Sequence, residues 1–213
     1  LAVVLVGEDS ASATYVRNKG HACGKVGIFT ETFHLPQDTS QEELLSLIRR
    51  LNLTPRFHGI LVQLPLPPQL DEDEVVRSLE PSKDVDGLHP VNVGRLVSGV
   101  GELLPCTPAG IQQMLLHSGY NPEGKHVVVC GRSNIVGKPL AILLMQKKPG
   151  ANATVTICHT GTHDLGAVTR QADILVVATG RPNTVTADMV RKGVVVIDVG
   201  VNRVEDSTRE LGY

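Results

Sequence analysis

Short apolar runs alternate with stretches of helical periodicity along the 213-residue chain. The runs predict strands at residues 2–6, 27–34, 59–63, 126–130, 154–158, 174–178 and 194–199. Between them, the spacing of apolar positions predicts helices at residues 11–25, 40–51, 71–79, 107–117, 138–146 and 187–192. Strands that alternate with helices indicate an α/β protein with parallel sheets built from βαβ units. Several strands, such as VVVC and ILVVA, are apolar throughout, which is typical of strands buried on both faces of a sheet.

Local signals predict one domain boundary. Thr107 ahead of Pro108 has the pattern of an N-cap followed by a proline at the first helical position. The turn sequence NPEG, residues 121–124, follows this helix. We therefore expect two α/β domains, residues 1–120 and 121–213, each with a parallel or mostly parallel sheet flanked by helices.

Composition and charge exclude several classes of partner. The chain is 41% hydrophobic, and 20 basic against 22 acidic side chains give a net charge of −2. This balance argues against nucleic-acid and membrane partners, which both require a basic surface. No apolar run reaches the roughly 18–20 residues of a membrane helix. Four scattered cysteines form no C-x-x-C pair, so we expect small buried side chains in a reducing, cytoplasmic compartment: Cys23, Cys106, Cys130 and Cys158.

The second half contains a glycine loop between a predicted strand and a predicted helix, in the sequence VVVCGRSNIVGKPL. Free backbone N–H groups and the helix dipole make such a helix start an anion site. Against the dinucleotide fingerprint G-x-G-x-x-G, Gly131 matches, Ser133 replaces the second glycine, and Gly137 lies one residue late. The pattern indicates a Rossmann-like domain, and the alternative is a βα turn with a purely structural role.

The end of the next predicted strand bears on the choice of cofactor. An acidic residue there would bond the ribose of NAD, but His159 and Thr160 occupy the position, and Arg132 lies in the glycine loop. A pocket without a carboxylate suits a ribose that carries a 2′-phosphate. The sequence therefore favours NADP over NAD.

A lysine in the first half is a candidate for proton transfer. Tyr15 and Lys19 are spaced i, i+4 on a predicted helix, so their side chains share a face. A lysine near a reacting centre can move protons, whereas the simpler interpretation is an exposed helix pair. The same Y-x-x-x-K pattern occurs in short-chain dehydrogenases. There it follows the nucleotide loop, while here it precedes Gly131 by more than a hundred residues, which disfavours that class.

Other polar residues lie where α/β proteins build their sites. Gln63 ends the strand GILVQ, at the carboxyl edge of a predicted parallel sheet, where it could instead cap the loop backbone. The acids of the segment KDVDG, residues 83–87, suit an Asx-turn better than a metal site, because no Glu or further Asp follows at loop spacing. His163 and Asp164 follow His159 in a glycine-containing loop, and we expect polar residues next to the cofactor there rather than a metal site.

Together these segments resemble the bifunctional methylenetetrahydrofolate dehydrogenase/methenyltetrahydrofolate cyclohydrolases, the FolD-type enzymes. The motifs occur in family order and cover nearly the whole chain. They are YVRNK at 15–19, GILVQLPLP at 59–67, KDVDG at 83–87 with His89 and Pro90, GRSNIVGKP at 131–139, and VIDVGVN at 196–202.

The resemblance implies two activities at one cleft. These are oxidation of 5,10-methylenetetrahydrofolate by NADP, with NAD as the alternative cofactor, and hydrolysis of the methenyl product to 10-formyltetrahydrofolate. Lys19 becomes the catalytic lysine, Gln63 its partner, Tyr15 the ring that stacks on the folate, and Asp86 the group that pairs with the pterin edge, with Leu64 also at the substrate. The implied cofactor contacts are Gly131, Arg132, Ser133, Thr160 and Val201, of which Arg132, Ser133 and Thr160 hold the 2′-phosphate.

The resemblance also carries expectations about the whole protein. Members usually form homodimers through the nucleotide domain. They continue past the position of Tyr213 and have a leading helix, so we interpret the chain as lacking both segments. Competing classes are a non-catalytic dinucleotide-binding module, which would not need the four polar residues of the first half, and a dehydrogenase without hydrolase activity.

Overall fold

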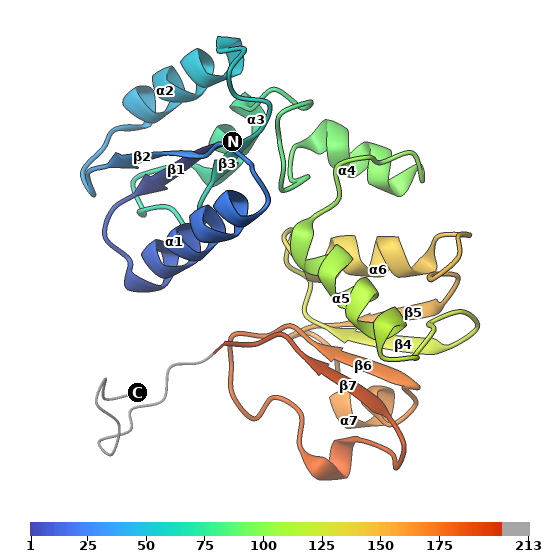
Figure 1. Ribbon diagram of the computed structural model, residues 1–213. Coiled ribbons are helices and arrows are strands. Elements are labelled where there is room, and N and C mark those ends of the chain that lie inside the picture. Colours follow the sequence, from blue (N-terminus) through green and yellow to red (C-terminus); the bar gives the residue numbers. More distant parts are fainter. Residues whose placement is uncertain (202–213) are drawn as a thin grey trace. The chain divides into compact units, whose positions relative to one another are not determined.

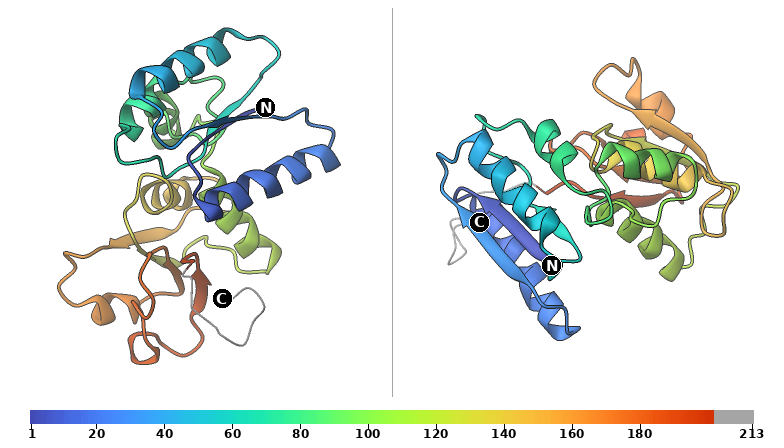
Figure 2. Two further views of the ribbon diagram at one scale, coloured as in Figure 1. Left: turned by 90° about the vertical axis from the view of Figure 1, so that its left-hand side faces the viewer. Right: turned by 90° about the horizontal axis from the view of Figure 1, so that it is seen from above.

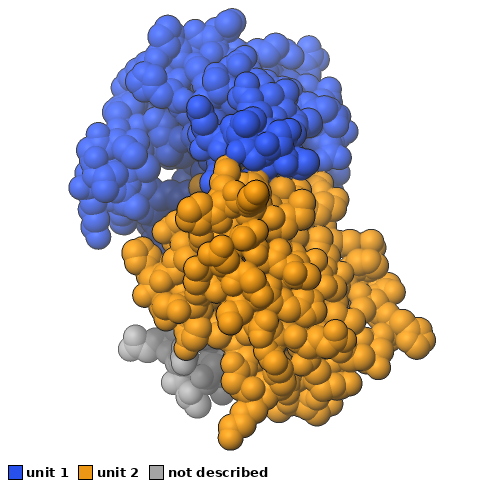
Figure 3. Space-filling model, turned by 90° about the vertical axis from the view of Figure 1, so that its right-hand side faces the viewer, with its two compact units in different colours: residues 1–104 blue, residues 105–213 orange. Residues whose placement is uncertain are grey.

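The computed structural model describes residues 1–201 and divides into two compact units, Leu1–Leu104 and Pro105–Tyr213 (Figure 3). The boundary therefore precedes the one expected near residue 120. The reason is helix α5 (Cys106–His117), whose buried Ile111 and Leu115 belong to the core of the second unit. The turn that follows this helix lies inside the second unit and does not link the two.

The first unit is built on a three-stranded parallel sheet in the order β2-β1-β3 (Figure 1). The strands are β1 (Ala2–Val6), β2 (Glu31–Leu35) and β3 (Ile60–Val62). All five residues of β1 are buried, as expected for an apolar central strand covered on both faces. Because β2 and β3 lie on opposite sides of β1, the strand order reverses next to β1.

Helices cover both faces of this sheet (Figures 1 and 2). Val4 faces the core formed with α2 (Gln41–Leu53) and α3 (Glu72–Ser78), whereas Val3 faces Val16 of α1 (Ser10–Lys25). Helix α4 (Pro90–Val97) follows them in the chain. Alternate residues of β1 thus supply two separate cores, which holds α1 and α2 on opposite sides of the sheet.

The second unit is a four-stranded parallel sheet in the order β5-β4-β6-β7. Its strands are β4 (His126–Cys130), β5 (Thr154–Cys158), β6 (Ile174–Val177) and β7 (Val195–Asp198). Val127 and Val129 pack against α5 and α6 (Gly137–Met145), while Val128 and Cys130 face the side of α7 (Leu165–Thr169) and the 3₁₀ helix η1 (Ala187–Met189). This doubly wound, Rossmann-like arrangement confirms the predicted fold class.

Several element boundaries differ from the prediction. Strand β2 begins at Glu31 because Gly27, at φ +74°, turns the chain after α1. Helix α5 begins at Cys106, so Thr107 is not its N-cap and Pro108 lies inside the first turn, where the absent N–H costs no helical bond. Two short helices, α4 and α7, were not predicted. No helix within residues 1–201 has both the length and the apolar composition needed to cross a membrane.

Candidate active and cofactor sites

Lys19 and Gln63 meet at the point in the first sheet where the strand order reverses. Lys19 lies on α1, which follows the central strand, and Gln63 comes directly after β3. The Nζ atom of Lys19 donates a hydrogen bond to Oε1 of Gln63 at 3.2 Å. Ligands of open α/β sheets bind at this kind of edge, so the contact marks a candidate active site.

The amide group of Gln63 is held from its other end. Its Nε2 donates to the carbonyl oxygen of Leu64 at 2.7 Å, and its backbone N–H donates to Val4 at 2.9 Å. With Nε2 committed to Leu64, the oxygen of the amide is the atom that faces Lys19. Leu64 thus contributes through its backbone, in addition to the substrate contact predicted from the sequence.

Tyr15 precedes Lys19 by one helical turn, and 52% of the residue is exposed. Residues four apart on a helix are neighbours on one face. An exposed aromatic ring beside a half-buried lysine offers an apolar surface to a flat ligand. The structure therefore leaves Tyr15 available for the stacking role that the sequence predicts.

The two carboxylates of the acidic turn have different environments. Asp84 is buried, and its Oδ2 accepts hydrogen bonds from the backbone N–H of His89 at 2.8 Å and from Nδ2 of Asn92 at 2.9 Å. Asp86 is half-buried on the same loop. Asp84 thus holds the loop through local hydrogen bonds, whereas Asp86 is the acid that the family resemblance assigns to the folate.

Two glycines shape the loop between β4 and α6 in the second unit. A β-carbon on Gly131 would lie 2.4 Å from the carbonyl oxygen of Ala178, and its φ of +128° is unfavourable for other residues. A β-carbon on Gly137 would lie 2.2 Å from the carbonyl oxygen of Gly131. The loop can therefore lie close against both the end of β6 and the start of α6, as a dinucleotide site requires.

Ser133 of this loop takes up the N–H groups at the start of α6. Oγ of Ser133 accepts hydrogen bonds from the N–H groups of Val136 at 3.0 Å and Gly137 at 3.4 Å, which leaves the hydroxyl hydrogen to donate elsewhere. The side chain of Arg132 is exposed. Ser133 therefore replaces the second glycine of the fingerprint with a side chain that also caps the helix.

The segment after β5 forms a tight turn. The backbone N–H of His159 donates to Oγ1 of Thr162 at 2.9 Å, and Nδ1 of His159 accepts from the N–H of Gly161 at 3.0 Å. Thr160 is exposed within this turn. Val201, 80% exposed, is the last described residue and follows β7. These residues follow the carboxyl ends of β5 and β7, the two outer strands of this parallel sheet, and none is a carboxylate.

Two cysteines lie in register beneath the glycine loop. Cys130 on β4 pairs with Cys158 on β5, and both are buried. Burial, followed by the neighbouring Cys158, raises the pKa of the Cys130 thiol to about 12. Cys130 and Cys158 are the small buried side chains that the sequence predicts, but Cys23 is only half-buried and Cys106 is exposed, so the expectation is wrong for Cys106 and not fully met for Cys23.

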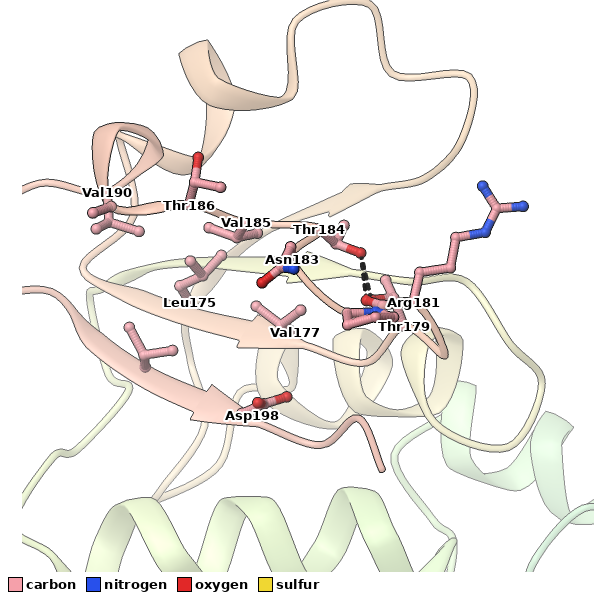
Figure 4. A pocket seen from close by; sticks show the side chains of 13 residues that line it. Leu175, Val177, Thr179, Arg181, Asn183, Thr184, Val185, Thr186, Val190 and Asp198 are labelled. Atoms are coloured by element: carbon pink, nitrogen blue, oxygen red, sulfur yellow. Dashed lines mark hydrogen bonds between the residues drawn. The ribbon is translucent and has the colours of Figure 1, made fainter. Parts of the chain in front are cut away.

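The second unit also contains a pocket of about 300 Å³ beside β6 and β7 (Figure 4). Leu175 and Val177 form an apolar wall, and Oγ1 of Thr179 donates to Oγ1 of Thr184 at 3.0 Å at the other end. Asp198 and Arg181 add charged groups. Sequence reasoning did not find this pocket, and it contains none of the residues predicted to bind the cofactor.

Asp164, considered for a metal site from its spacing to His163, has a structural role. Its Oδ1 accepts the N–H of Ala167 at 2.8 Å and caps α7. Within residues 1–201, no group of three or more His, Cys, Asp or Glu side chains is arranged to hold a metal ion.

A parallel sheet with its glycine loop at the switch point defines the second unit as a dinucleotide-binding domain. Comparison with family models matches residues 1–86 to the catalytic domain and residues 105–213 to the NAD(P)-binding domain of tetrahydrofolate dehydrogenase/cyclohydrolase. The chain therefore belongs to the tetrahydrofolate dehydrogenase/cyclohydrolase family, as the sequence motifs predict.

Individual relatives agree with this assignment. The bifunctional protein FolD of Syntrophus aciditrophicus (strain SB) is 57% identical over 204 residues, which are 96% of this chain and 70% of that protein. The crystal structure of a FolD from Campylobacter jejuni has a TM-score of 0.90 at 47% identity, covering 100% of this chain and 72% of that one. A FolD from Trypanosoma brucei, complexed with NADP cofactor and inhibitor, has a TM-score of 0.91 at 38% identity, covering 100% and 71%.

Proposed function

We propose that the protein is a bifunctional enzyme of one-carbon metabolism. It oxidises 5,10-methylenetetrahydrofolate to the methenyl form with NADP⁺ and hydrolyses the methenyl form to 10-formyltetrahydrofolate. The observation that carries the proposal is the Lys19–Gln63 hydrogen bond at the switch point of the catalytic domain. In this hydrogen bond, the neutral amide of Gln63 orients the amine of Lys19, and the amine is a group that can carry a proton.

The hydrolysis needs a group that moves a proton. Water adds to the methenyl carbon, the bond from this carbon to N5 breaks, and the formyl group stays on N10. One proton of the water ends on N5 and the other is released. Lys19 is the group of this site that takes and delivers a proton, because its Nζ cycles between charged and neutral forms. Gln63 accepts from Nζ in both forms and holds it in place.

The substrate is bound by the remaining polar and aromatic groups of the first unit. Tyr15 offers its exposed ring to the flat folate. The carboxylate of Asp86 accepts two N–H groups from the amino-pyrimidinone edge, a pairing that a planar carboxylate suits. Leu64 lies next to Gln63, whose amide its carbonyl group holds, and adds a further substrate contact.

We place NADP⁺ at the glycine loop of the second unit, which lies close against β6 and α6 because Gly131 and Gly137 carry no side chain. Gly131 and Val201 line the dinucleotide, and Arg132, Ser133 and Thr160 bind its 2′-phosphate. When bound, the cofactor supplies the acceptor for a hydride. The contribution of the protein to that step is orientation, with no carboxylate among these residues to repel the phosphate.

The two proposed sites belong to different units of the chain. The folate site belongs to the unit that ends at Leu104, and the cofactor site to the unit that begins at Pro105. Homodimerisation through the nucleotide-binding unit and a cytoplasmic location remain proposals from the family resemblance. Size-exclusion chromatography with light scattering and cell fractionation test them.

Spectrophotometric assays of the full-length protein test the function. We expect reduction of NADP⁺ with methylenetetrahydrofolate, faster than with NAD⁺, and decay of methenyl absorbance without cofactor. Absence of reduction with either nucleotide would overturn the dehydrogenase assignment. Reduction without accelerated methenyl decay would restrict the protein to the dehydrogenase reaction.

A further inference from the structure

Asp84 is a buried acidic side chain for which the proposed reaction has no use. It is 1% exposed and lies in the first unit, two residues before Asp86. Burying a carboxylate is costly unless hydrogen bonds compensate it. Its two donors converge on one oxygen, Oδ2: the backbone N–H of His89 and the side-chain Nδ2 of Asn92. The carboxylate therefore ties the loop to the first residues of α4.

The loop is also fixed to the sheet at its beginning. Asp84 forms a parallel bridge with Ile60, the first residue of β3, and the N–H of Ile60 donates to Lys83 at 2.7 Å. The N–H of Gly87 donates back to the carbonyl of Asp84 at 3.2 Å, with Gly87 at φ +65°. Asp86 thus lies inside a turn that is closed on both sides by contacts of Asp84.

Neighbouring residues keep this segment against the sheet. Nζ of Lys83 donates to three carbonyl groups at the end of α2, those of Leu51, Asn52 and Thr54. A β-carbon on Gly59 would lie 2.4 Å from Cγ1 of Val85, so the loop packs where a side chain is absent. β3 carries Gln63 at its other end. The same strand therefore supports both the lysine partner and the acidic loop.

We propose that Asp84 is a positioning residue: through His89 and Asn92 its carboxylate holds the loop in the conformation that presents Asp86 to the folate. The inference rests on the proposed function and on the role of Asp86 within it. Asp84 acts as a hydrogen-bond acceptor, and its charge is secondary. An asparagine, whose Oδ1 can occupy the place of Oδ2, should therefore preserve the geometry, whereas an alanine should not.

Steady-state kinetics of three single variants and one double variant of the full-length enzyme test the inference. For Asp84→Ala we expect the KM for methylenetetrahydrofolate to rise about tenfold. This is the size of effect expected if the displaced Asp86 carboxylate loses one of its hydrogen bonds to the folate. The KM for NADP⁺ and kcat should stay within about twofold, because a loop that only binds substrate contributes equally to ground and transition states. Asp84→Asn should restore most of the affinity. Asn92→Ala should raise the same KM, and adding it to Asp84→Ala should have little further effect, since both belong to one network.

The control separates positioning from general destabilisation. Thr39→Val removes another buried polar group of the first unit, whose Oγ1 donates to Pro36 at 2.7 Å, and should leave the KM unchanged. If Asp84→Ala does not fold, Asn92→Ala and Asp84→Asn decide the question. The inference would be overturned if folded Asn92→Ala had an unchanged KM for methylenetetrahydrofolate. It would also be overturned if Asp84→Asn raised this KM as far as Asn92→Ala or Asp84→Ala does. A wild-type enzyme inactive on folates would overturn the proposed function itself, and the inference with it.

Discussion

Nζ of Lys19 lies 3.2 Å from Oε1 of Gln63, although 44 positions separate the two residues in the chain. The contact forms because α1 follows the central strand and Gln63 comes directly after the neighbouring strand β3. The parallel register of β1 and β3 sets how far Gln63 extends beyond the sheet. A catalytic pair is thus created by topology, and neither residue alone defines it.

Replacing Lys19 tests this pair. Lys19→Met or Lys19→Gln should abolish methenyl hydrolysis, a loss of about 10²-fold or more, since positioned proton transfer contributes 10²–10⁴-fold. Binding of NADP⁺, which belongs to the other unit, should be retained and can be measured by calorimetry. Arg17→Met, an exposed cation two residues away on α1, is the matched control. Full hydrolysis by either Lys19 variant would remove the lysine from the mechanism.

Arg132 should decide between the two nicotinamide cofactors. Arg132→Ala should raise the KM for NADP⁺ about tenfold or more, because it removes a charge-assisted contact to the 2′-phosphate, and change that for NAD⁺ little. The ratio of kcat/KM for the two cofactors is the measurement. Lys192→Ala, at the amino end of β7, removes a charge from the opposite edge of the sheet and should leave the ratio as it is. Equal losses with both cofactors would contradict the assignment.

Gly137 should not accept even a methyl group. Gly137→Ala would force the glycine loop away from α6 and should cost about 1–3 kcal/mol of stability, as overpacking does, while also weakening NADP⁺ binding. Denaturant unfolding and cofactor titration measure the two effects. Gly110→Ala is the comparison: its β-carbon meets nothing within 4 Å on α5, and helix propensity favours alanine, so it should be neutral or stabilising. Similar behaviour of the two variants would contradict the steric argument.

Asp173 should make stability depend on pH. A hydrogen bond from the N–H of His126, followed by the charge of Arg191, lowers the pKa of this carboxyl group. A lowered pKa stabilises the fold above the ordinary value, and the stabilisation is lost as the pH falls through the folded-state pKa. Asp173→Asn should therefore cost about 1 kcal/mol at pH 7, discounted for partial exposure. Urea unfolding at several pH values should show this difference shrinking below about pH 4; a difference independent of pH would contradict it.

Much of this architecture is readable from the sequence, and the reasons are local. Strands β1, β4 and β5 have the predicted bounds because their apolar, β-branched residues end at glycines or polar residues. Helix α4 was missed because it is only eight residues long and contains Gly94, which weakens a helix prediction. The short strand β2 was overextended because the apolar Ile28 and Phe29 continue its pattern past the turn after α1.

The candidate site shows where sequence reasoning stops. The motifs identify Lys19 and Gln63, but only the fold shows that the carbonyl group of Leu64 orients the amide of Gln63 toward Lys19. The family motif points to Asp86 and gives Asp84 no role, and only the structure shows that Asp84 is buried and bonded to the start of α4. Similarly, Thr179 follows β6 and Asp198 ends β7, which is paired with β6, so their shared pocket has no signature along the chain.

Backbone carbonyls lie so close to Gly131 and Gly137 that these positions cannot be used to redesign cofactor preference. A side chain at either position would collide with the carbonyl group opposite it, so a substitution there would disturb the packing of the loop and would not test how the cofactor is recognised. The exposed side chains of Arg132, Asn134 and Thr160 border the same loop without that limit. A library intended to exchange one nicotinamide cofactor for the other should vary these three positions and leave both glycines unchanged.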